Sequence, residues 1–310
     1  MMKAPQRILA VLLLSAVAQS AAAVSIVFDY SYDSGGFFAD TARKNTLNQA
    51  GAYLGNRLQD KLTAITSGGS NNFTAKFFNP SDPNMVASDV SIPNASVAAN
   101  VIRVYVGASN LGGTTLGIGG PGGLGASGSQ AFVDNAVSRG QTGALAPKPT
   151  DFGPWGGSLG FNSTSTNWFF DQDTSTAKTF TGFDFFSVAV HELGHLLGVG
   201  TAASWSNQIS GSNFNGAFSS AVHGGPVPLA DAGHWALGTT GMVNGSLQEA
   251  AMGPNISAGQ RKYFTDLDFA ALKDIGWEVS PAPVPLPGAL VLLFSGLSLM
   301  VAWGKRSASV

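Results

Sequence analysis

One stretch of the sequence decides how the rest is interpreted: Phe185-Phe-Ser-Val-Ala-Val-His-Glu-Leu-Gly-His195. Its spacing predicts a helix from Phe183 to about Val199. Residues four apart on a helix differ by only about 40° around the axis, so His191 and His195 leave the same face. Two neutral imidazoles one turn apart match two vertices of a tetrahedral zinc site. The stretch therefore predicts a metal centre with His191 and His195 as ligands.

Glu192 follows the first of these histidines directly. At that position its carboxylate is expected to point near the metal without binding it, where it can accept a proton from metal-bound water. The spacing His-Glu-x-x-His is the pattern of zinc proteases, and Glu192 is its catalytic residue. The alternative is a pair of buried histidines bonded to backbone carbonyls. All four histidines of the chain fall within residues 191–234, which favours the metal.

A zinc site needs a third protein ligand. Residues 191–201 resemble the compact metzincin pattern His-Glu-x-x-His-x-x-Gly-x-x-His, with Gly198 at the position where the helix breaks. Thr201 stands where that pattern has its last histidine, and a hydroxyl is a poor zinc ligand. The third ligand must therefore come from further along the chain. The candidates are His223, His234 and Glu249.

We predict His234 as the third ligand. Trp235 can anchor its segment against the protein, and Asp231 can accept the hydrogen of the other ring nitrogen, as metal-bound histidines require. His223 lies before Gly224-Gly-Pro226, a turn that offers little to orient an imidazole, and is expected at the surface. Glu249 remains the alternative if the third ligand is a carboxylate.

The sequence after the helix carries a second resemblance. It comprises Gly233-His-Trp235, Glu249-Ala-Ala-Met-Gly-Pro254, and a segment from Phe264 that ends in Asp274-Ile-Gly-Trp277. A delayed His, a Met in a turn and a short helix ending in Asp-Ile-Gly-aromatic resemble the leishmanolysin branch of the metzincins, and exported bacterial zinc proteases with PEP-CTERM tails. The resemblance covers about residues 180–280. It implies zinc bound by His191, His195 and His234, with Glu192 as the base.

The same resemblance implies a Met-turn at Met252 under the metal, for which an ordinary core methionine is the alternative. A phenol such as Tyr263 is expected to help stabilise the oxyanion. Asp171, Asp173 and Asp184 have two interpretations: a structural calcium site built from hard oxygen ligands, or turn and cap residues.

The order of the remaining elements predicts an α+β fold. The resemblance adds a metzincin-like arrangement, with a twisted N-terminal sheet and helices, an active-site helix, and a loop-rich C-terminal part holding the Met-turn. Residues 107–129 are nearly half glycine without periodicity, which predicts a flexible surface loop. The expected strands are 24–29, 71–78, 101–106 and 167–171, and the other expected helices are 40–65 and 267–275.

The two ends are expected to direct export. Residues 1–23 have the basic start, apolar run and small final residues of a signal peptide, for which a permanent N-terminal membrane anchor is the alternative. Residues 281–310 form a proline-rich spacer, an apolar run at 288–303 and a basic pair at Lys305 and Arg306. This tail resembles a PEP-CTERM sorting signal of Gram-negative bacteria, although Val284-Pro-Leu-Pro287 departs from the usual Val-Pro-Glu-Pro. The resemblance implies membrane retention and cleavage near Pro287 by an exosortase; a permanent transmembrane anchor is the alternative.

The amino-acid composition excludes several classes of function. Charged residues are 11% of the chain and the net charge is −2, which argues against a nucleic-acid binder. The absence of cysteine excludes disulfides, cysteine-bound zinc and thiol catalysis. The sequence thus predicts that residues 24–280 form a secreted or cell-surface zinc endopeptidase acting on proteins or peptides. The alternatives are an inactive extracellular matrix or surface protein that keeps the fold, and a metal-dependent hydrolase of non-peptide bonds.

Overall fold

The computed structural model describes residues 24–281 apart from 85–88, 165, 172, 175 and 177. The predicted signal peptide and the tail from residue 282 lie outside the described residues. Within the described part of the chain, no helix is both long and apolar enough to cross a membrane.

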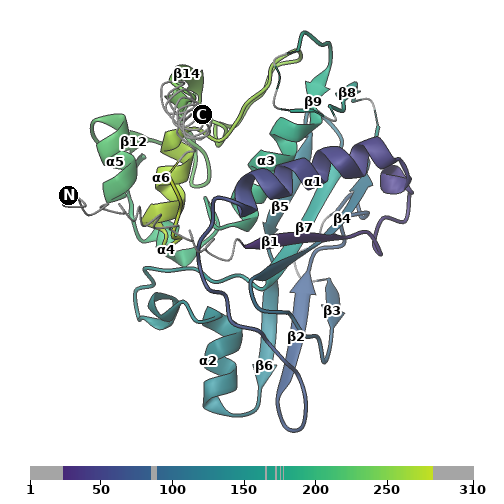
Figure 1. Ribbon diagram of the computed structural model, residues 1–310, viewed down its shortest axis with the longest axis vertical. Coiled ribbons are helices and arrows are strands. Elements are labelled where there is room, and N and C mark those ends of the chain that lie inside the picture. The colour runs from purple at the N-terminus through teal and green to yellow at the C-terminus, as the bar shows by residue number, and fades with distance from the viewer. Residues whose placement is uncertain are drawn as a thin grey trace, which may run out of the picture.

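A four-stranded sheet forms the centre of the fold, in the order β1-β4-β7-β5 (Figure 1). Its strands are β1 (Ser25–Asp29), β4 (Val101–Ser109), β5 (Gly117–Pro121) and β7 (Gly156–Asn162). The first three in spatial order are parallel, whereas β5 runs antiparallel to β7 at the edge. All of β7 and most of β4 are buried, because helices α1 (Thr41–Gly55) and α3 (Phe185–Leu196) pack on the sheet.

A second, smaller sheet joins the first at its edge. It contains β3 (Val90–Ile92), β2 (Asn72–Phe77) and β6 (Gly123–Ser127), all antiparallel, with helix α2 (Gln130–Ser138) packed on it. Only Gly122 separates β5 from β6, so one continuous segment leaves the large sheet and enters the small one. A separate core lies here, in which Trp155 packs against Phe73 and Phe77.

The second half of the chain consists of short elements joined by loops. They are β8 (Trp168–Phe169), β9 (Phe183–Asp184), α4 (Ala203–Ser206), β10 (Ile209–Ser210), β11 (Asn213–Phe214), α5 (Ala217–His223), β12 (Val227–Pro228), β13 (Thr240–Val243), β14 (Ser246–Glu249) and α6 (Asp266–Asp274). Two single-turn 3-10 helices, Phe37–Ala39 and Thr142–Leu145, complete the described elements. The predicted α+β class is confirmed.

Five predicted elements are confirmed with shifted ends: β1, β2, β4, α3 and α6. The helix expected at 40–65 is half as long as its pattern suggested, because α1 ends at Gly55. Leu58 and Ile65 are buried in extended chain that bridges to Val279 and Val97. Of the strand expected at 167–171, only the two residues of β8 form a strand.

The prediction of a surface loop at 107–129 was wrong, since this stretch holds β5 and β6. Its glycines allow close packing instead of flexibility. A Cβ on Gly119 would lie 2.6 Å from the backbone oxygen of Glu192, and one on Gly117 would lie 3.0 Å from the Glu192 carboxylate. Glycine is therefore what lets the edge strand lie directly on α3.

Candidate metal centre

Helix α3 carries the first two histidines on rigid backbone. It begins at the cap residue Asp184, whose carboxylate accepts hydrogen bonds from the N–H and the hydroxyl of Ser187. After Leu196 the chain turns at Gly198, where φ is +110°, as a break at this position requires. Thr201, at the place of the missing histidine, donates its hydroxyl hydrogen to the carbonyl of His195 at 2.6 Å. The same carbonyl accepts from the N–H of Gly198 at 3.0 Å, so Thr201 adds a further hydrogen bond at the end of the helix.

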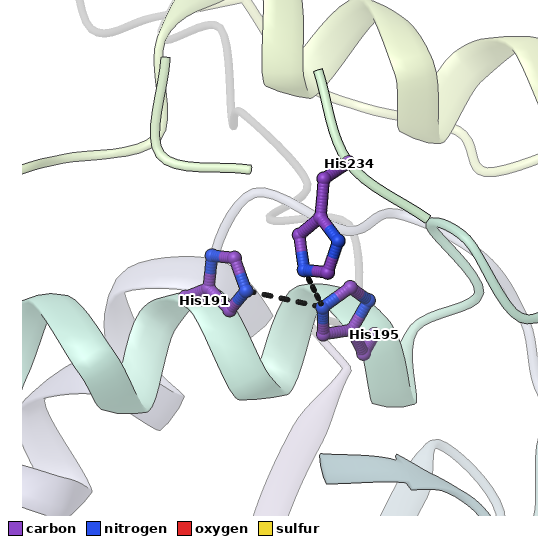
Figure 2. Close-up of side chains that lie close together, drawn as sticks. All are labelled: His191, His195 and His234. Atoms are coloured by element: carbon purple, nitrogen blue, oxygen red, sulfur yellow. Dashed lines mark hydrogen bonds between the residues drawn. The ribbon is translucent and has the colours of Figure 1, made fainter. Parts of the chain in front are cut away.

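Three imidazoles converge above this helix. His191 and His195 project from successive turns of α3, and His234 reaches them from a loop on the opposite side (Figure 2). The Nε2 atom of His195 lies 3.1 Å from that of His191 and 3.2 Å from that of His234. The rings of His191 and His234 face each other, with centroids 5.2 Å apart. Among the described residues, these three form the one group of side chains spaced to hold a metal ion.

The hydrogen-bond partners of the Nδ1 atoms determine which ring nitrogen of each histidine carries the hydrogen. The Nδ1 of His191 lies 2.7 Å from the carbonyl of Ala251, and that of His195 lies 2.8 Å from the carbonyl of Val199. A carbonyl only accepts, so both Nδ1 atoms carry the hydrogen and both Nε2 atoms carry a lone pair. Lone pairs at this separation repel each other unless a cation lies between them. Tetrahedral zinc with bonds of 2.0–2.1 Å would separate its nitrogen ligands by about 3.3 Å. The cluster fits such an ion.

Burial keeps the two helical imidazoles in the form that binds metal. It lowers the pKa of His191 well below its usual value, and it lowers the pKa of His195 to about 4. Both rings are therefore neutral at pH 7 without any metal, and each offers its Nε2 lone pair directly.

His234 is held by the neighbours predicted for it. Asp231 accepts from its Nδ1 at 2.9 Å and from the N–H of Gly233 at 2.7 Å. Trp235 is fully buried, so the backbone next to the ligand is fixed. The loop also packs closely on the turn after α3, because a Cβ on Gly200 would lie 2.5 Å from the Cα of Gly233.

The two other candidates for the third ligand lie elsewhere. His223 is the exposed last residue of α5, a helix where the sequence suggested a turn. Glu249 forms an ion pair with the ammonium of Lys262 at 2.8 Å, which lowers its pKa although burial acts in the opposite direction. The structure thus brings His234, and neither alternative, to His191 and His195.

Glu192 lies beside the cluster with its carboxylate under β5. Burial raises its pKa to about 8, and the backbone N–H of Gly119 opposes the shift by hydrogen bonding to the carboxylate. A buried carboxyl group with a pKa near neutrality can both accept and release a proton at physiological pH.

A cleft of about 840 Å³ contains the three histidines and Glu192. One wall is β5 and the residues before it, from Thr114 to Gly119, and the opposite wall is the loop Pro254–Ser257. The carbonyl of Leu116 accepts from Asn162 in β7, so alternation along the strand turns the backbone groups of Gly117 and Gly119 toward the cleft. This edge pairs with no other strand in the described part of the chain.

No known family, curated protein or solved structure matches this chain. What can be said of its function therefore comes from the residues and from the geometry of the centre.

Asp268 is a residue of this centre that sequence reasoning missed. It is fully buried in α6, and its carboxylate accepts from the N–H of Ala251 at 2.9 Å and from the indole of Trp235 at 2.9 Å. It therefore joins the segments that hold His191 and His234. Met252, which also donates its N–H to Asp268, is fully buried, and its sulfur lies where a Cβ on Gly194 would be. The one sequence signal for Asp268 is the capping box that it forms with Thr265 at the start of α6.

Tyr263, Asp171, Asp173 and Asp184 are not among the described residues that line the cleft, and Asp173 accepts a hydrogen bond from the hydroxyl of Thr176. The phenol of Tyr263 donates to the carbonyl of Thr174, and this residue is not among those that line the cleft. Arg261 binds Asp184 and Asp171 at 2.8 and 2.9 Å, and Lys178 also contacts Asp171. These cations neutralise the two carboxylates, which leaves Asp184 in the cap role.

Proposed function

We propose that this protein is a zinc-dependent endopeptidase in which His191, His195 and His234 hold the metal. One observation carries the proposal. The Nε2 atoms of His191 and His234 lie 3.1 and 3.2 Å from that of His195, each ring has its Nδ1 at an acceptor, and the carboxyl group of Glu192 lies in the same cleft. The metzincin fold is part of the proposal, supported by the antiparallel edge strand over α3 and by Met252 packed against that helix.

Zinc in such a site lowers the pKa of a water molecule and polarises the scissile carbonyl. The protein's part falls to Glu192, whose carboxylate accepts a proton as water attacks and passes it to the departing amine. The Gly119 N–H holds the carboxylate in position under the edge strand.

The free edge of β5 supports a peptide substrate over a non-peptide one. An extended peptide can add to a sheet edge through main-chain hydrogen bonds. Gly117 presents its N–H and carbonyl to the cleft above Glu192, and Gly119 presents its carbonyl there while its N–H bonds the Glu192 carboxylate. A peptide bound there would lie beside the histidines with its carbonyl groups in reach of the centre.

The alternative of an inactive surface or matrix protein gains less support. Burial of a carboxyl group costs stability, and the Gly119 N–H is the interaction that opposes the effect of burial on the pKa of Glu192. Catalysis gives a reason for a carboxyl group at this position, whereas a matrix role gives none. For localisation, we propose export by the N-terminal signal, followed by retention at the surface through the PEP-CTERM-like tail and release by an exosortase.

The test combines metal content and activity in matched variants of the exported chain. The wild-type protein should bind about one zinc ion and hydrolyse casein, with activity lost on chelation and restored by zinc. Glu192→Gln should keep the zinc and lose hydrolysis. Glu278→Gln changes an exposed glutamate and should keep both. A wild-type protein that binds no zinc would overturn the proposal, and a zinc-bound protein that cleaves no peptide would favour the matrix alternative.

A further inference from the structure

A second hollow lies outside the metal centre, between α5, α6 and β13. This apolar groove has a volume of about 360 Å³, and its floor holds aromatic rings at Tyr53, Phe264 and Phe269. The rim carries large apolar side chains open to solvent at Phe218, Val222 and Met242. Exposed apolar side chains gathered around a groove indicate a binding surface.

The described chain ends in this groove. Pro281, its last residue, lines the groove together with Val279 and Ser280. Three contacts fix the path of this segment: a bridge from Val279 to Leu58, a hydrogen bond from the Ser280 N–H to the carbonyl of Arg57 at 2.8 Å, and another from the Arg57 guanidinium to the carbonyl of Ser280 at 3.0 Å. Whatever follows residue 281 therefore starts at the groove.

We propose that the proline-rich spacer, residues 282–287, binds in this groove of its own chain. The segment reads Ala-Pro-Val-Pro-Leu-Pro. Alternating prolines favour the polyproline II conformation, and segments of this kind bind in grooves lined with aromatic residues. The proposal concerns the tail and is independent of the zinc centre.

The chemistry of the groove matches such an occupant. A proline lacks an N–H, so a proline-rich segment presents mainly carbonyl acceptors and apolar rings. The groove offers the matching donors in Arg57, Lys273 and Asn244. Arg57 lies over the ring of Phe269 at 4.0 Å and Lys273 lies near that of Phe218 at 5.8 Å, so the cations are already placed among the aromatic rings.

Geometry favours the chain's own spacer over a partner. Six residues in polyproline II span about 19 Å, and the first of them directly follows Pro281, which lines the groove. Because the spacer is attached at the rim, its effective concentration there is of millimolar order or higher. A weak site would thus be filled by the attached segment before any free ligand.

Cross-linking in the full chain tests the proposal without background, because the chain contains no cysteine. The test protein carries Met242→Cys on the rim and Val284→Cys in the spacer, and a short bismaleimide joins thiols that lie close together. The control pairs Val284→Cys with Val137→Cys in α2, a site remote from α5 and α6 (Figure 1) with the same exposed fraction as Met242, 42%. We expect the rim pair to cross-link within one chain about fivefold more than the control.

Two further measurements decide what fills the groove. Phe218→Asp, at a side chain 53% exposed, should reduce cross-linking of the rim pair to the control value while thermal unfolding stays unchanged. The free peptide of residues 282–287 should compete only at about millimolar concentration. Equal yields for the two pairs would overturn the proposal. Cross-linking between two chains would also overturn it, because the groove would then take the spacer of a second copy.

Discussion

The carboxylate of Asp268 accepts the backbone N–H of Ala251, whose own carbonyl lies 2.7 Å from Nδ1 of His191. One residue of α6 thereby fixes the acceptor that sets the tautomer of His191, a proposed metal ligand on α3. The same carboxylate binds the indole of Trp235, next to His234. Two of the three imidazoles are thus oriented through a group that does not touch the centre itself.

Asp268→Asn should weaken zinc binding about 10–100-fold, because partners behind the ligands contribute on that scale. The asparagine NH2 group would also face the N–H groups of Ala251, Trp235 and Thr265, which now donate to the carboxylate. Because two donors cannot pair, the free energy of unfolding should fall by about 1–3 kcal/mol. Competition with a chelator measures the first effect and denaturant unfolding the second. Asp266→Asn, at an exposed aspartate in the same turn of α6, is the control. Equal zinc affinity in the two variants would contradict the positioning role.

His234→Ala should leave the protein without tightly bound zinc and without hydrolytic activity. Two imidazoles remain, and two ligands do not complete a zinc site. His223→Ala, at the exposed end of α5, should keep both properties. Metal analysis after dialysis against a weak chelator distinguishes the variants. Zinc retained in His234→Ala and lost in Glu249→Ala would move the third ligand to the carboxylate.

Gly119→Ala should destabilise the protein by about 1–3 kcal/mol, since the new methyl group would meet the backbone oxygen of Glu192 and the side chain of Leu159. Hydrolysis per folded molecule should also fall, because β5 would move away from α3 and the Gly119 N–H would leave the Glu192 carboxylate. Gly120→Ala changes the next residue of the strand, where a Cβ meets nothing within 4 Å, and should be neutral within about 0.5 kcal/mol. Unchanged activity in Gly119→Ala would show that this N–H is dispensable.

Asp60 should make the protein less stable as the pH rises from about 4 to 7. Burial raises its pKa from 3.8 to about 7, although the N–H of Glu278 lowers it in part, and its other oxygen has no partner among the described residues. The folded state therefore keeps a proton that the unfolded state releases, and this loss is of the order of 2–4 kcal/mol at pH 8. The loss of stability is complete above the pKa that Asp60 has in the folded protein, and it is absent below about pH 4.

Urea unfolding of the wild type and of Asp60→Asn at several pH values measures this effect. The amide does not titrate, so the variant should gain stability relative to the wild type between pH 5 and 8. Asp134→Asn, at a side chain hydrogen bonded to Gln130 in α2, is the control for replacing a carboxyl group by an amide. A pH-independent difference between Asp60→Asn and the wild type would show that Asp60 titrates normally in the folded protein.

The helix and its histidines could be predicted because spacing along one helix determines which side chains share a face. His234 could be predicted from Asp231 and Trp235, which are its neighbours in the sequence and hold it in the structure. Asp268 could not, because it acts across 17 residues through backbone groups that any residue would offer. Contacts of this kind leave no pattern in one sequence.

The prediction of a surface loop at residues 107–129 was wrong for a different reason. Its glycines weaken the propensity for β-strand, yet the strand forms because β7 pairs with it and α3 packs on it. The prediction that the first helix continues beyond Gly55 was wrong for the same reason. Leu58 and Ile65 keep helical spacing by accident, and their burial depends on Val279 and Val97, far away in the sequence. Long-range packing overrode local preference in both places.

The chain passes from β5 to β6 through Gly122, so the small sheet helps to hold β5, which lines the cleft, in place. The ring of Trp155 occupies the space beside Gly122, and its indole N–H donates to the carbonyl of Gly123. The segment that shapes the cleft is thus anchored in the core of Phe73, Phe77 and Trp155. Partial unfolding of that core would release β5, the edge strand over Glu192, while β1, β4 and β7 remained paired. On heating, hydrolysis would then cease before the main unfolding transition.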